Sequence, residues 1–206
     1  MPRYQPPSLP SGPLFAAPAD AATGVLLGSS QPNWYTFASG YKLAADLLAA
    51  PLGERGVVAE HVCLPILFLY RHFVELSLKA LLLDLGELID HVEPASPKHP
   101  LRPLWERFVT RLQATGVARP DSWLDQIGSW VLELDGLDSR SFTFRYPVDT
   151  AGKAMLAGGQ LIDIGHVAGV MSEIAGIFIG AAEVIGQHLD IKRDLEDEFA
   201  GEYHNG

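Results

Sequence analysis

The sequence has a single cysteine, Cys63, among its 206 residues, so no disulfide can form within the chain and a zinc site built from several cysteines is excluded. It also has no glycine-rich phosphate-binding loop of either common form. Basic residues are few, with 15 Lys and Arg against 25 Asp and Glu, which gives a net charge of −10. The composition therefore argues against non-specific binding of nucleic acid or of an anionic membrane by the chain as a whole.

Long uninterrupted apolar runs are also missing. The Leu14–Gly28 stretch is broken by a proline and an aspartate, and no secretory signal is expected. The most apolar stretch, Ile164–Leu189, contains Glu173 and Glu183, so we expect a buried helix of a soluble protein and no membrane association. Together with the lone cysteine, this predicts a cytoplasmic protein.

Apolar residues recur at helical spacing through most of the chain, which predicts an all-α, up-and-down bundle of about five helices. The bundle is expected to span residues 31–190, after a flexible Pro- and Ala-rich arm over residues 1–30. Residues 191–206 are expected to form an acidic tail that frays. The predicted helices cover residues 34–50, 56–89, 101–115, 121–134 and 160–189.

Local signals refine this prediction. Asn33 is expected to cap the first helix, and Pro65 is expected to kink or split the second. Residues 141–148 alternate and are rich in aromatics, which predicts an extended segment or short hairpin before the last helix. Glycines four residues apart in the last helix would let another helix approach closely, so we expect a homodimer.

Four polar residues lie inside the very apolar second helix: Arg71, His72, Glu75 and Lys79. At 100° per residue they share one face. Arg71 with Glu75, and Glu75 with Lys79, are opposite charges four apart, as expected for a structural brace or a solvated face. Alternatively, the stripe lines a cleft in which Arg and His hold a phosphate or carboxylate. We expect no metal site and no cofactor.

The segment Ser141–Asp149 is a second candidate site. Arg145 lies between two aromatic residues, and a proline that stiffens the backbone follows Tyr146. We take Arg145, Tyr146 and Asp149 as candidate ligand-binding residues. The alternative is that the aromatic side chains plug the end of the bundle while Arg145 pairs with an acid such as Glu75.

A locally basic stretch, Lys98–Arg119, is the third candidate. Arg107 and Arg111 share a helix face there. Surface solvation explains most runs of this kind, but an acidic protein could contact RNA or another anion at such a place.

Four segments, in this order, resemble the HEPN (higher eukaryotes and prokaryotes nucleotide-binding) superfamily. They are FASGYKLAADLL, YRHFVELSLKALL, KHPLRPLW and FRYPVD, and the resemblance covers about Trp34 to Leu189. It implies an up-and-down helical bundle, often a dimer. In catalytic members it implies a metal-independent ribonuclease of bacterial toxin–antitoxin or phage-defence systems.

The sequence departs from the catalytic signature of that superfamily, an Arg followed four to six positions later by a His. After Arg145 those positions hold Asp149, Thr150 and Ala151. We therefore expect a non-catalytic module that dimerises and binds a protein partner or an RNA- or nucleotide-type anion. The expected ligand-binding residues are Arg71, His72, Glu75, Lys79, Arg145, Tyr146 and Asp149.

The alternative is a divergent ribonuclease. In that case His72 or His99 would act as general base or acid. Arg71 or Arg145 would stabilise the charge of the transition state.

Overall fold

The computed structural model describes residues 33–53, 58–116, 121–156, 158–159 and 161–204, and six positions before residue 33. The chain divides into two units, residues 1–32 and residues 33–206. The predicted arm, residues 1–30, lies almost entirely outside the described residues. All the helices described below belong to the second unit.

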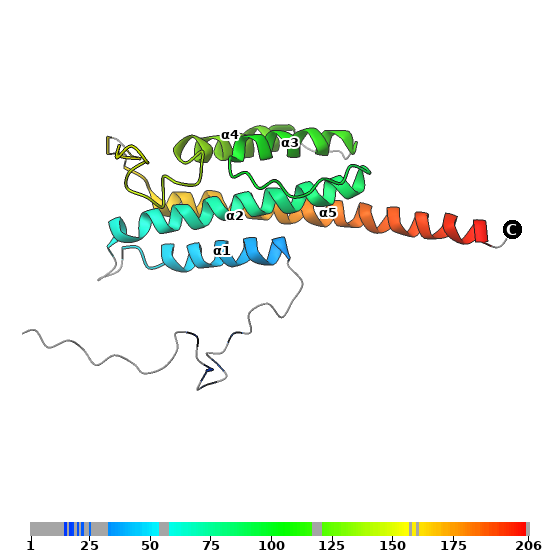
Figure 1. Cartoon of the computed structure of the whole chain (residues 1–206), viewed down its shortest axis with the longest axis horizontal. Helices are drawn as coiled ribbons and strands as arrows, with labels where there is room; N and C mark the ends of the chain where they lie inside the picture. The colour runs from blue at the N-terminus through cyan, green and yellow to red at the C-terminus, as the bar shows by residue number, and fades with distance from the viewer. Residues whose placement is uncertain are drawn as a thin grey trace, which may run out of the picture. The chain divides into compact units, whose positions relative to one another are not determined.

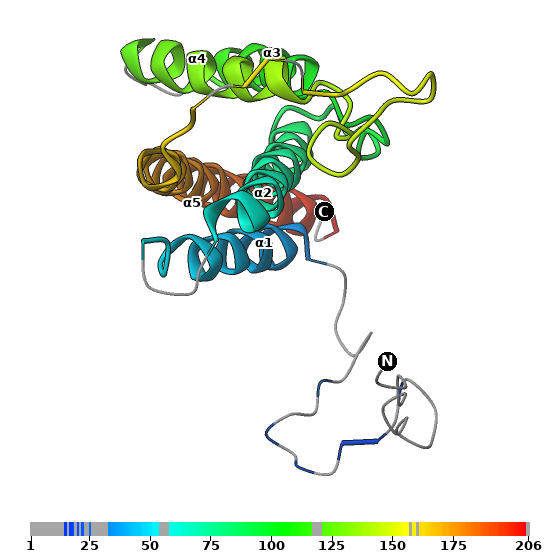
Figure 2. The same ribbon diagram turned by 90° about the vertical axis from the view of Figure 1, so that its left-hand side faces the viewer.

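The described residues contain five α-helices, which confirms the all-α prediction. They are α1 (Trp34–Ala49), α2 (Ala59–Leu88), α3 (Leu101–Ala114), α4 (Asp121–Leu137) and α5 (Ile164–His204). Helix α2 packs against α1, α3 and α5, and α4 packs on α3 (Figure 1). Figure 2 shows α2 in the centre, with α1 on one side and the α3–α4 pair on the other.

The beginnings of the first two helices follow from local chemistry. Asn33 caps α1 as predicted, because its side-chain oxygen accepts hydrogen bonds from the amides of Tyr35 and Thr36, at 2.9 and 3.2 Å. Helix α2 runs through Pro65 as one element, so the predicted split does not occur. Proline removes one hydrogen bond of the ladder, but most of the helix beyond it is buried and held by packing.

The last helix is longer than predicted: α5 continues to His204, and residues 191–204 are helical where fraying was expected. Two basic residues fix this part of α5 to the end of α2. Lys192 Nζ donates to the carbonyl of Glu87 at 2.7 Å, and Arg193 pairs with the Glu87 carboxylate at 2.7 Å. These contacts join α5 and α2 beyond the predicted end of the helix.

The segment before α5 also differs from the prediction. Residues 141–147 form turns, with no strand or hairpin among them, and Ser141 has a positive φ of 60°. In the described part of this segment, the strand-like pairing is one isolated bridge between Val148 and Ala154. The side chain of Asp138, rather than cross-strand pairing, holds the turns.

Helix α3 runs in the same direction as α2. His99, just before α3, lies beside Glu75, while Arg111, near its end, donates to the carbonyl of Leu82 at 2.8 Å. The segment 89–100 therefore returns along α2 before α3 begins (Figure 1). This return places a histidine against the middle of the buried helix.

The core lies where α2, α3 and α5 meet. Phe178 of α5 packs against Phe73 of α2 and Phe108 of α3, with ring centroids 6.4 Å apart in both pairs. By length and composition, the Ile164–Ala200 part of α5 passes the test for a helix that could cross a membrane, because an 18-residue window within it has a mean hydropathy of 1.6. Core helices of soluble proteins pass the same test, so the absence of a membrane stays a prediction.

Candidate functional site

The Glu75 carboxylate is the centre of a buried polar group. Its side chain is 1% exposed and accepts hydrogen bonds from Arg71 Nη1 at 3.0 Å and Lys79 Nζ at 2.7 Å. His99 Nδ1 lies 2.9 Å from the same oxygen that Lys79 contacts. We call Arg71, Glu75, Lys79, His99 and Asp138 the Glu75 cluster.

Arg71 joins three parts of the chain. Its side chain is fully buried, and besides Glu75 it donates to two backbone carbonyls, from Nη2 to His99 at 2.7 Å and from Nε to Asp138 at 2.7 Å. A planar guanidinium suits this role because its donors point in fixed directions. The contacts of Arg71 therefore hold the return segment and the end of α4 against α2.

Asp138 organises the turns after α4. Its Oδ1 accepts the amides of Phe142 and Thr143, at 2.7 and 2.9 Å, and its Oδ2 lies 3.6 Å from Arg71 Nε. Oδ2 is buried and has no hydrogen-bond partner among the described residues. Asp138 and Arg71 are both fully buried, and the Asp138 carboxylate compensates the positive charge of Arg71.

A second aspartate acts on the neighbouring helix. Asp135 Oδ1 accepts the amide of Leu101 at 2.7 Å, so it satisfies a free donor at the first residue of α3. Sequence reasoning missed both Asp135 and Asp138. Two aspartates at the end of a helix, just before Ser139, are a signal for side-chain capping that could have found them.

Glu75 is ionised over the whole physiological range. Burial, the largest effect, raises the pKa of its carboxyl, but His72, Lys79 and His99 favour the charged form and together lower the pKa to about 2. An ionised carboxylate only accepts hydrogen bonds, so His99 donates its Nδ1 proton to it. The cluster is thus internally paired, with both of its buried cations facing carboxylates.

His72 lies at the edge of this cluster. Its Nδ1 is 3.9 Å from Glu75 Oε2, beyond hydrogen-bond distance, and no described group bonds to it. The ring is 22% exposed and packs edge-on against Tyr41 at 4.3 Å and parallel to Phe68 at 5.8 Å. Its position is set by aromatic contacts more than by the cluster.

Arg145 does not face Glu75, and no ion pair to an acid is found for it in the described part of the chain. Its guanidinium lies instead over the rings of Phe68, Phe142 and Tyr146, at 5.5, 5.0 and 5.7 Å from their centroids. Its Nε donates to the Ser141 carbonyl, which leaves both terminal nitrogens without a described acceptor. We call Phe68, Phe142, Arg145 and Tyr146 the aromatic–arginine surface.

The other two residues predicted in this loop have different surroundings. Tyr146 is 51% exposed and stacks on Phe142 with centroids 5.6 Å apart. Asp149 tightens a turn, since its Oδ1 accepts the amides of Ala151 and Lys153, both at 2.9 Å. Tyr146 therefore belongs to the aromatic–arginine surface, and Asp149 has a local structural role.

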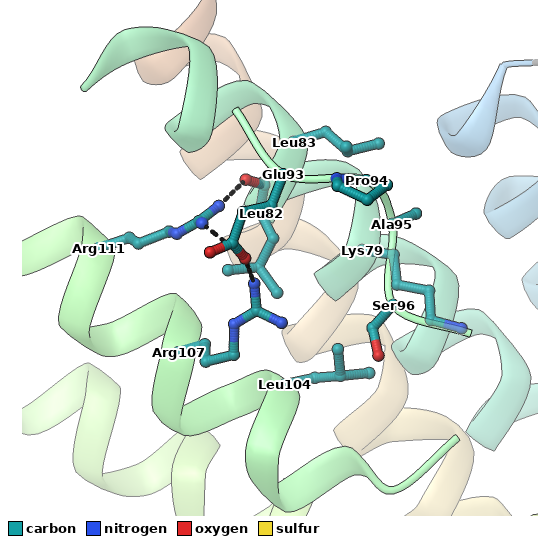
Figure 3. Close-up of a pocket in the computed structure, with 10 residues that line it drawn as sticks. All are labelled: Lys79, Leu82, Leu83, Glu93, Pro94, Ala95, Ser96, Leu104, Arg107 and Arg111. Atoms are coloured by element: carbon teal, nitrogen blue, oxygen red, sulfur yellow. Dashed lines mark hydrogen bonds and ion pairs between the residues drawn. The ribbon is translucent and has the colours of Figure 1, made fainter. Parts of the chain in front are cut away.

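Two arginines of the basic stretch on α3 are neutralised by the return segment. Arg107 and Arg111 both pair with Glu93, and Figure 3 shows the two guanidinium groups converging on this carboxylate. The cavity beside them measures about 10 Å³, room for one water molecule. Arg119, at the end of the stretch, lies outside the described residues. Arg107 and Arg111 thus serve packing.

Comparisons with family models, with curated proteins and with solved structures match nothing to this chain.

Proposed function

We propose that the protein is a non-catalytic, HEPN-like helical module that binds a nucleotide- or RNA-type anion at the aromatic–arginine surface. One observation carries the proposal. Arg145 is exposed and has no acid partner among the described residues, although acids outnumber bases in this protein. Its two terminal nitrogens can therefore donate to a phosphate from outside the chain.

The rings around Arg145 suit the rest of such a ligand. Phe142 and Tyr146 are 47% and 51% exposed, so both keep ring surface available to solvent. Nucleic-acid bases stack on exposed aromatic rings with little sequence preference, while arginine neutralises the phosphate. One cation beside two available rings matches a phosphate joined to a base better than it matches an inorganic anion.

The Glu75 cluster is the poorer binding site of the two. Arg71 and Lys79 are 0% and 6% exposed and already pair with Glu75. An incoming phosphate would have to displace a buried carboxylate, which leaves that carboxylate uncompensated. The polar residues of α2 therefore form a structural brace in this proposal. The ligand binds at the aromatic–arginine surface instead.

One contact favours the alternative, a divergent metal-independent ribonuclease. His99 is half exposed, and its Nδ1 is held by the ionised Glu75. This fixes the tautomer that leaves Nε2 free to accept a proton, as a general base requires. However, no described contact joins His99 to Arg145, so the two groups are not shown to act on one phosphate.

The binding proposal is tested by fluorescence anisotropy with a labelled single-stranded RNA oligonucleotide in EDTA. Arg145→Ala should weaken binding at least tenfold, since it removes the cation and its contacts with three rings. Arg140→Ala is the matched control, because Arg140 is exposed in the same loop and makes no described ion pair or ring contact. Equal losses in both variants would show only general electrostatic attraction, and no loss in either would refute the proposal.

A further inference from the structure

An apolar groove opens between α5 and the α3–α4 pair. It has a volume of about 370 Å³, and its walls include Trp123 and Ile127 of α4 and Ile177, Gly180, Ala181 and Val184 of α5. Trp123 is 55% exposed. We call this the α4–α5 groove. Apolar surface left open to this extent marks an interaction site more often than a random feature of a soluble protein.

Helix α5 itself carries an exposed apolar stripe that continues from the groove. Val184, Ile191, Leu195 and Phe199 are 38%, 58%, 48% and 60% exposed. They are spaced by seven, four and four residues, so at 100° per residue they lie on one side of the helix. We call these four residues the α5 stripe. The C-terminal end of α5 extends past the other helices (Figure 1), so the described chain does not cover the end of the stripe.

The stripe and the groove are complementary when α5 is reversed. If a second α5 lies antiparallel with His188 opposite His188, Leu195 falls opposite Ala181, seven positions on either side of the centre. Phe199 falls opposite Ile177, eleven positions on either side. Bulky residues at one end of the stripe thus meet smaller ones in the groove.

Two glycines provide the room that this arrangement needs. A Cβ atom added at Gly176 or Gly180 would meet no described atom within 4 Å, so both positions are open notches on the surface of α5. Both lie within one turn of Ile177. A phenylalanine from an opposing helix can therefore approach the α5 backbone closely.

We propose that the α4–α5 groove receives the C-terminal end of α5 from a second copy of this chain, in a reciprocal antiparallel dimer. The same surface serves both copies, which is the requirement of a closed two-fold interface. A lipid surface fits less well. The end of α5 is acidic, and its two basic residues, Lys192 and Arg193, already pair with acids of the same chain, so an anionic membrane would repel it.

The first test is the mass of the full chain in solution, by light scattering at micromolar concentration. Wild type should be a dimer, and Leu195→Glu with Phe199→Glu should be a monomer with unchanged helix content, because both side chains are exposed. Ile179→Glu is the matched control and should stay dimeric, since Ile179 is 60% exposed on another side of α5. A monomeric wild type, or a dimer that survives both stripe substitutions, would overturn the proposal.

A crosslink tests the register. In a Cys63→Ser background, the double variant with Ala181→Cys and Leu195→Cys should form disulfides that join position 181 of one copy to position 195 of the other. A variant with either substitution alone should not form a disulfide. The two positions are about 21 Å apart along one helix, too far for a bond within one chain. Failure of the pair to link, or binding of the full chain to neutral phosphatidylcholine vesicles with loss of the dimer, would contradict the antiparallel arrangement.

Discussion

His99 Nδ1 lies 2.9 Å from Oε1 of Glu75, 24 residues away in sequence. This contact joins the return segment to the middle of α2, and Arg71 reinforces it by donating to the His99 carbonyl. It explains why α3 begins beside the centre of α2 and runs parallel to it. A buried carboxylate thus determines where a helix starts.

Replacing Glu75 should strongly destabilise the protein. Glu75→Gln leaves Lys79 buried without a compensating charge and leaves Arg71 with Asp138 as its remaining carboxylate, which should cost roughly 3 kcal/mol or more in free energy of unfolding. Urea titration measures it. The control is Glu87→Gln, which removes an exposed pair with Arg193 and should cost less than about 1 kcal/mol. Equal effects in both variants would refute a buried brace.

The same carboxylate should give the stability a characteristic pH dependence. The pKa of Glu75 is lowered from 4.5 to about 2 on folding, so its ionisation stabilises the folded state fully above about pH 4.5. The contribution, on the order of 3 kcal/mol, is lost as the pH falls through 2. Unfolding titrations from pH 6 to pH 2 should show a loss in the wild type that is smaller in Glu75→Gln. Parallel curves for the two proteins would contradict this.

Asp138 should couple the brace to the aromatic–arginine surface. Asp138→Ala removes the acceptor of the Phe142 and Thr143 amides, so these amides should exchange hydrogen faster and RNA affinity should fall. Asp138→Asn keeps the Oδ1 acceptor and should preserve amide protection better than the alanine variant. Hydrogen–deuterium exchange of residues 141–147 measures this. Full protection in Asp138→Ala would show that other contacts hold the loop.

Tyr146 should contribute to RNA binding through its ring and not through its hydroxyl. Tyr146→Ala should weaken RNA binding by about 1–3 kcal/mol, the range for one base stacked on an aromatic side chain. Tyr146→Phe should bind like the wild type, because no described hydrogen bond involves the hydroxyl. Anisotropy titrations compare the two variants. If Tyr146→Phe bound RNA more weakly than the wild type, the hydroxyl would take part in hydrogen-bonded recognition instead.

Much of the fold could be predicted because it depends on local pattern. Apolar spacing gave the five helices, and the side chain of Asn33 gave the start of α1. The grouping of Arg71, Glu75 and Lys79 also followed from their four-residue spacing on one helix. These features need no knowledge of distant contacts.

The rest depends on contacts between residues far apart in sequence. The approach of Asp138 to Arg71, 67 positions earlier, has no local signature. Likewise, Arg145 lies against aromatic rings because Asp138 and the positive φ of Ser141 set the turns before it. The alternative of a pair between Arg145 and an acid such as Glu75 is therefore not found among the described residues. The four polar residues of α2 could therefore be recognised from the sequence, but which of them face solvent could not.

We propose that this protein binds RNA-type ligands without cleaving them and that the Glu75 cluster is structural. The most direct test incubates end-labelled single-stranded RNA with the purified protein in EDTA and resolves bound and cleaved RNA. We expect intact RNA with the wild type, and equal RNA binding by the wild type and His72→Ala. Cleavage by the wild type that disappears in His72→Ala or His99→Ala would contradict it.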